Sequence, residues 1–136
     1  SATSSNQNQL NPENDIKPTY ELTDEDNKVL IEVNLITEGY QVVKVITGYE
    51  NALGNYASVG MISKGTTRLE VAKQVGAGFG ALYGAWKDKD LYIVSLNNYV
   101  NMCYFALERD KLKRMIEGGI SNSELFSSIE ADCVPV

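Results

Sequence analysis

The stretch that decides the fold is residues 28–47, which read KVLIEVNLITEGYQVVKVIT. Ten of these twenty residues are Val, Ile or Thr, whose branching at Cβ restricts χ1 in a helix and suits the pleated surface of a sheet. Apolar side chains alternate along 29–36, and residues 37–39 then provide a turn before the apolar run of 40–47. This pattern predicts a β-hairpin with two antiparallel strands over 29–36 and 40–47.

The same stretch also has the spacing of an amphipathic helix. A helix that begins after an N-cap on Thr23 would place one apolar side chain per turn on a common face. Those side chains, at intervals of four and three residues, are Val29, Val33, Ile36, Tyr40 and Val43. The density of β-branched residues favours the hairpin, and the helix is the alternative.

The rest of the chain alternates glycine-containing connectors with short apolar runs, and capping and turn residues place the later elements. In chain order we expect a connector over 48–65, a helix over 66–76 that ends at Gly76, strands over 77–86, 91–96 and 99–107, a helix over 108–117, and a short helix from a Ser121 or Ser123 cap to Ile129. The expected fold class is α+β, with a single domain over 21–136. Its antiparallel sheet would combine the N-terminal hairpin with a C-terminal three-stranded meander, accompanied by two to three helices.

The N-terminal segment has the composition of a tether. Leu10 and Ile16 are the only large apolar residues in 1–18, and such a segment buries too little surface to offset the entropy lost on ordering. We therefore expect residues 1–20 to form a flexible polar and acidic tether. Its beginning, SATSSNQNQ, resembles the polar tail that follows the lipidated cysteine of bacterial lipoproteins. That resemblance implies membrane attachment only through an anchor upstream of this sequence.

Charge and composition exclude several classes of function. The chain of 136 residues has no histidine, which removes Ser-His-Asp and Cys-His nucleophile activation and the zinc sites that need histidine. Residues 13–38 carry eight acids and two lysines, which accounts for the whole net charge of −6. Nucleic-acid binding needs a basic surface, so we expect no nucleic-acid partner.

Two near matches to nucleotide-binding motifs fail where the chemistry lies. Residues 60–67 resemble a phosphate-binding loop, but Thr66 stands where the phosphate-contacting lysine should be. Residues 76–81 resemble a dinucleotide fingerprint, but the expected order of helix and strand around them is reversed. We therefore expect a non-catalytic protein without a cofactor or a metal site.

The two cysteines, Cys103 and Cys133, match no metal-binding spacing. In the cytosol they would be free thiols, whereas in an oxidising compartment they would close a loop of about 30 residues, worth roughly 3 kcal/mol in the loop-entropy model. We expect an intramolecular disulfide if the protein is exported.

Without catalytic residues, function is expected to come from a surface that binds another protein. Two candidate surfaces follow from the sequence, one aromatic and one basic. The aromatic candidates in the predicted meander are Tyr83, Trp86 and Tyr92, and the basic candidates on the helix over 108–117 are Arg109, Lys113 and Arg114. The aromatic surface ranks first, because aromatic side chains supply most of the binding energy at interfaces and rim charges mainly steer encounter.

The segment LYIVSLNNYVNMC, residues 91–103, resembles type IVb pilin subunits. Those subunits have a strand, an Asn-rich turn and then the first cysteine of a C-terminal disulfide, which correspond here to 91–96, 97–98, and Cys103 with Cys133. The resemblance implies a filament subunit as one alternative. The favoured expectation is a non-catalytic binding or assembly component exported to the periplasm or cell surface of a bacterium, with a tethered lipoprotein as one form of it. An immunity-type inhibitor of a basic toxin is a further alternative, consistent with a small acidic chain.

Overall fold

The computed structural model describes residues 20–136, so the expected tether lies outside the described residues except for Tyr20. The fold is α+β, and its elements alternate along the chain. The helices are α1 (Asp24–Thr37), α2 (Arg68–Ala85), α3 (Arg109–Gly118) and α4 (Asn122–Ser128). The strands are β1 (Gln41–Glu50), β2 (Gly54–Ile62), β3 (Leu91–Asn97), β4 (Asn101–Glu108) and β5 (Glu130–Pro135).

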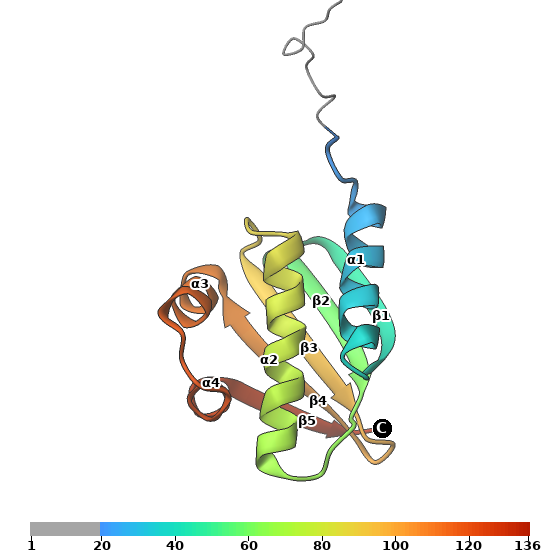
Figure 1. Cartoon of the computed structure of the whole chain (residues 1–136), viewed down its shortest axis with the longest axis vertical. Helices are drawn as coiled ribbons and strands as arrows, with labels where there is room; N and C mark the ends of the chain where they lie inside the picture. Colours follow the sequence, from blue (N-terminus) through green and yellow to red (C-terminus); the bar gives the residue numbers. More distant parts are fainter. Residues whose placement is uncertain (1–19) are drawn as a thin grey trace, which may run out of the picture.

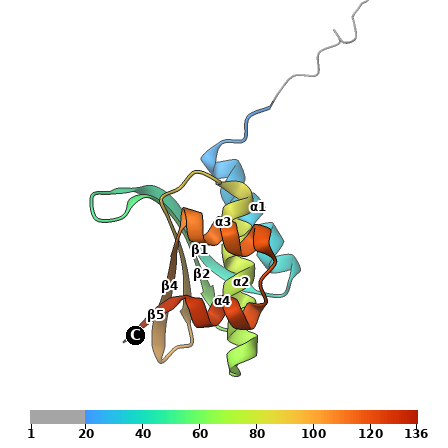
Figure 2. The same cartoon turned by 90° about the vertical axis from the view of Figure 1, so that its left-hand side faces the viewer.

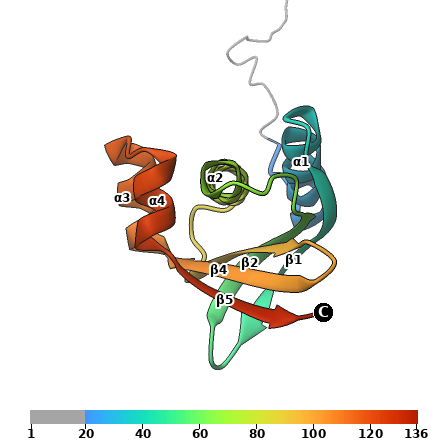
Figure 3. The same ribbon diagram turned by 90° about the horizontal axis from the view of Figure 1, so that it is seen from below.

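The five strands form one sheet in the order β1-β2-β3-β4-β5 (Figure 1). All neighbours are antiparallel except β2 and β3, which run parallel because α2 connects them as a crossover. The expectation of a purely antiparallel sheet is therefore wrong, and the sheet is mixed. The helices lie on one face of the sheet, with α2 between α1 and the pair α3 and α4, and no helix of residues 20–136 covers the other face (Figures 2 and 3).

The hairpin predicted over 28–47 is wrong, because its first half is helix α1. The alternative was right about the start of this helix: the side chain of N-cap Thr23 accepts a hydrogen bond from the amide of Asp26, and the Asp26 carboxylate accepts one from the amide of Thr23. The helix nevertheless ends at Thr37, so only the second half of the stretch becomes strand β1. Capping and the burial of one helical face outweigh the β propensity of this segment.

The glycine-containing segments also differ from expectation. The connector expected over 48–65 contains the end of β1 and all of β2, and the strand expected over 77–86 is the second half of α2. Gly76 does not end this helix. A Cβ at Gly78 would lie 2.9 Å from Cγ2 of Val94 in the sheet, so glycine there permits the helix to pack close to β3.

The second half of the chain follows its sequence signals more closely. Strands β3 and β4 and helices α3 and α4 lie within a few residues of the expected positions. Gly119 adopts a left-handed conformation with φ 67° after α3, and Ser121 caps α4. The expected disulfide joins Cys103 in β4 to Cys133 in β5, two residues that face each other across the strand pair.

Candidate protein-interaction surface

The aromatic candidates lie in the core and do not form an accessible surface. Tyr83, Trp86 and Tyr92 have exposed fractions of 8%, 6% and 0%. Because 77–86 is helical, Tyr83 lies on the face of α2 that packs on the sheet, where its ring meets that of Tyr92 edge-on at 6.0 Å. The prediction of an aromatic binding surface is wrong at these three residues.

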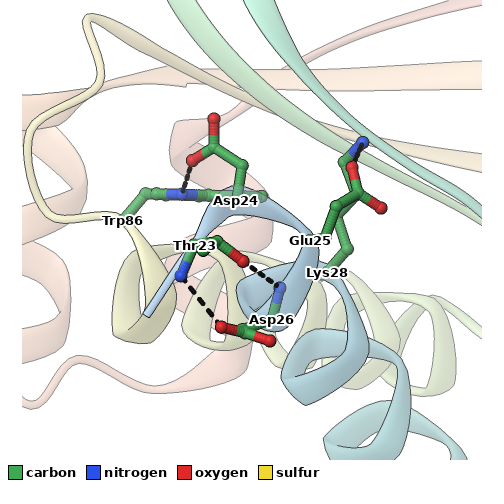
Figure 4. Close-up of polar contacts among 6 residues, drawn as sticks. All are labelled: Thr23, Asp24, Glu25, Asp26, Lys28 and Trp86. Atoms are coloured by element: carbon green, nitrogen blue, oxygen red, sulfur yellow. Dashed lines mark hydrogen bonds and ion pairs between the residues drawn. The ribbon is translucent and has the colours of Figure 1, made fainter. Parts of the chain in front are cut away.

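Trp86 and Tyr92 instead connect the elements of the core. The Trp86 indole donates a hydrogen bond of 3.1 Å to the Asp24 carboxylate, which ties the end of α2 to the first turn of α1 (Figure 4). The Tyr92 hydroxyl donates to the carbonyl of Trp86 at 2.5 Å, and burial of this side chain raises its pKa. These contacts fix the position of α1 against α2.

The basic candidates are more accessible. Lys113 and Arg114 are exposed on α3, whereas Arg109 is half-buried and its guanidinium donates to the carbonyl of Asp88 at 3.3 Å. On the same helix Leu112 is buried, whereas Ile116 is 43% exposed. Docking of an acidic partner on this basic face stays a prediction.

The largest exposed apolar feature of α1 is a stripe formed by the first three residues of the apolar face named for the alternative helix. Val29, Val33 and Ile36, which we call the outer stripe, are 57%, 52% and 59% exposed. The opposite face of the helix is buried, with Ile31 at 0% and Leu35 at 1%. A helix that is apolar on two opposite faces has one face for the core and one left for another surface.

A groove runs along the seam between α1 and α2, which lie side by side and point in opposite directions (Figure 1). It consists of two adjoining hollows of about 240 and 380 Å³ that share Asn34, Gly80 and Ala81. The exposed residues Leu22 and Leu30 line the smaller hollow, at the N-terminal end of α1. We call this feature the α1–α2 groove.

Two glycines keep this groove open. A Cβ placed on Gly80 or Gly84 would meet no atom within 4 Å, unlike one on Gly78. Glycine inside a helix costs about 1 kcal/mol relative to alanine, and packing within the described part of the chain does not require it at these two positions. The glycines therefore leave space that a contact from outside the domain could fill.

One buried polar residue lines the groove. Asn27 is only 7% exposed and lines the hollow next to Leu30 and Gly84. Its backbone amide donates to the carbonyl of Thr23, but within residues 20–136 its side-chain amide has no hydrogen-bond partner. An unpaired buried amide costs roughly 1–3 kcal/mol, so this side chain has an unmet capacity for hydrogen bonding.

The α1 side of the groove is acidic, whereas Lys64 and Lys73 lie with Glu38 in a neighbouring hollow at its C-terminal end. Six carboxylates lie between residues 21 and 38, and the single lysine there, Lys28, pairs with Glu25 at 3.0 Å. The first turn of α1 carries Asp24, Glu25 and Asp26 (Figure 4). The α1 side of the groove thus has a negative potential that favours cationic ligands.

Other site types can be assessed for the described residues. Within 20–136, no three His, Cys, Asp or Glu side chains are grouped so that they could hold a metal ion. No helix in the same range is long and apolar enough to cross a bilayer.

Comparison with protein-family models, with curated proteins and with solved structures found no match for this chain. The functional argument therefore depends on the surfaces described above.

Proposed function

We propose that this protein is a non-catalytic, exported binding or assembly component that acts through protein–protein contacts. The observation that carries the proposal is the outer stripe of α1. Its three β-branched side chains are each more than half exposed, on a helix whose opposite face is already packed in the core. Contiguous exposed apolar surface of this kind is typical of an interaction site.

The disulfide supports export. Disulfides persist in oxidising compartments and are rare in the cytosol, so the Cys103–Cys133 bond indicates a non-cytoplasmic protein. We infer the periplasm or the cell surface of a bacterium, with residues 1–20 as a tether that lets the domain reach a partner. A lipid anchor upstream of Ser1 would supply the membrane attachment.

A photo-crosslinking residue at Val33 tests the proposal. Placed in the native gene and irradiated in the native host, it should give an adduct of one defined mass, because the partner covers the outer stripe. The adduct should disappear when Val29 and Ile36 are changed to Ser. The control position is Tyr49, which is 65% exposed near the end of β1. Absence of an adduct at Val33, or equal adducts at both positions, would contradict the proposal.

A filament subunit similar to type IVb pilins is the second candidate. It is supported by the position of α1, which follows the N-terminal segment and leaves its outer stripe free, and by the disulfide between the last two strands. In this case the Val33 adduct would contain a second copy of the chain, and electron microscopy of the host would show filaments that antibodies to this protein label. An adduct with a small basic enzyme would instead support an immunity-type inhibitor.

A further inference from the structure

We propose that the α1–α2 groove is the docking site of an amphipathic α-helix from a partner protein, with lysines or arginines along the flanks of that helix. The inference rests on the proposed function, because it names the chemistry of the partner. It concerns a different surface from the outer stripe, namely the seam beside it, whose floor is Gly80, Ala81 and Gly84.

The shape of the groove favours a helix. Gly80 and Gly84 are one turn apart on the same side of α2, and the space above both is open. Small residues at intervals of four let a second helix approach closely, so that side chains pack against backbone over several turns. Leu22 and Leu30 are 55% and 44% exposed and would pack on the apolar face of the incoming helix.

Asn27 gives the groove a specific polar contact. Its buried side-chain amide faces the hollow without a partner in residues 20–136. A Ser, Asn, Gln or Lys side chain on the docked helix would supply the missing hydrogen bond. A helix without such a group would bury this amide still unpaired, so Asn27 selects among apolar helices.

The acidic residues of α1 indicate which residues flank the contact face of the partner helix. The exposed carboxylates of Asp24 and Asp26 lie in the first turn of α1, and a partner with basic flanks would pair with them. The segment that precedes α1 is a poor occupant by the same criterion, because residues 1–19 carry Glu13 and Asp15 against one lysine. Like charges along the groove would oppose its docking.

Two synthetic peptides test this proposal on the full chain. Both are 18-residue helices with an Ala, Leu and Ser contact face, and they differ only in carrying Lys or Glu on the flanks. In nuclear magnetic resonance titrations, the Lys peptide should shift the amides of Leu30, Asn34 and Gly84 and the side-chain amide of Asn27. It should bind at least about tenfold more tightly than the Glu peptide at low salt, as expected for a few exposed ion pairs.

A filled groove provides the matched variant. Gly80→Leu with Gly84→Leu adds side chains into open space, so the variant should fold with an unchanged or higher Tm and lose at least about tenfold in affinity for the Lys peptide. The control is Gly118→Leu, at the end of α3, where a Cβ also meets no atom within 4 Å. Its affinity should match that of the parent chain.

The possible outcomes separate this inference from the proposed function. Shifts confined to the open face of the sheet, equal binding of both peptides, or binding unaffected by the two leucines would overturn the groove proposal. A free chain that dimerises and protects the groove amides would also overturn it, because a second copy would then be the occupant. In all these cases a Val33 adduct in the native host would leave the proposed function standing, and its absence would remove that function separately.

Discussion

The elements nearest the two ends of the described chain are held in place by different means. Helix α1 is attached by side chains: Ile31 and Leu35 are buried in the core, and Asp24 accepts a hydrogen bond from Trp86. Strand β5 is attached by backbone pairing with β4 and by a covalent bond, while Cys133 and Val134 are exposed. Helix α1 is thus held through its inner face and the end of α2, while its outer stripe stays exposed.

The largest expected effect is on the inner face of α1. Leu35→Ala should lower the free energy of unfolding by about 2–5 kcal/mol, because it removes a fully buried side chain and leaves a cavity. Urea denaturation followed by circular dichroism measures this change. An effect below about 1 kcal/mol would mean that α1 is not held by its inner face.

The disulfide has the next largest expected effect. Replacing Cys103 and Cys133 by Ser should lower the free energy of unfolding by about 3 kcal/mol, because the bond closes a loop with a sequence separation of 30 residues. Amide hydrogen exchange should also become much faster in β5 than in β1. Uniform acceleration across the sheet would show that β5 is not selectively fastened by the bond.

The hydrogen bond between Trp86 and Asp24 has a smaller expected effect on the attachment of α1. Trp86→Phe keeps a buried ring but removes the donor, and should cost about 1–2 kcal/mol from the lost hydrogen bond and the reduced volume. Asp24→Asn retains an acceptor oxygen and serves as the milder comparison. Equal losses for the two variants in thermal unfolding would argue against a specific role of the indole N–H.

The smallest expected effect on stability is on the outer stripe. Val33→Ala should change the free energy of unfolding by less than about 0.5 kcal/mol, because its side chain is already 52% exposed. The same urea assay, run beside Leu35→Ala, gives a direct ratio between the two faces of one helix. A loss as large as that of Leu35→Ala would show that the outer stripe is covered within the protein itself.

The parts of the fold with short-range signals could be predicted from the sequence. Gly119, the Ser121 cap and the Asn97-Asn98 turn each depend on local backbone chemistry, and the structure has the corresponding helix end, helix start and turn near those positions. The period of two in a strand likewise places Tyr104 and Phe105 of β4 on opposite faces, with Tyr104 43% exposed and Phe105 3%. These features do not require knowledge of which surfaces pack together.

The candidate site could not be predicted, because it depends on which faces the fold covers. Val33 and Leu35 are both apolar residues of one helix, and only the position of α2 and the sheet decides that Leu35 is inside. Gly80 and Gly78 are likewise indistinguishable in sequence, yet one borders open space and the other touches β3. The sequence feature that could have indicated the site is the presence of two apolar stripes in 24–37. Two such stripes are typical of a helix with one face in the core and one face against a partner.

The order of the strands has a consequence for how quickly this chain can reach its native state. Strands β1 and β2 are joined by a short turn, and so are β3 and β4, whereas α2 separates β2 from β3 in the chain and α3 and α4 separate β4 from β5. The two turn-connected pairs therefore form from contacts of short sequence separation, which form fastest, and the β2–β3 and β4–β5 pairs must wait for the helices between their strands. Since the chain has two cysteines, oxidation offers one intramolecular pairing, and maturation in an oxidising compartment requires no reshuffling between alternative disulfides.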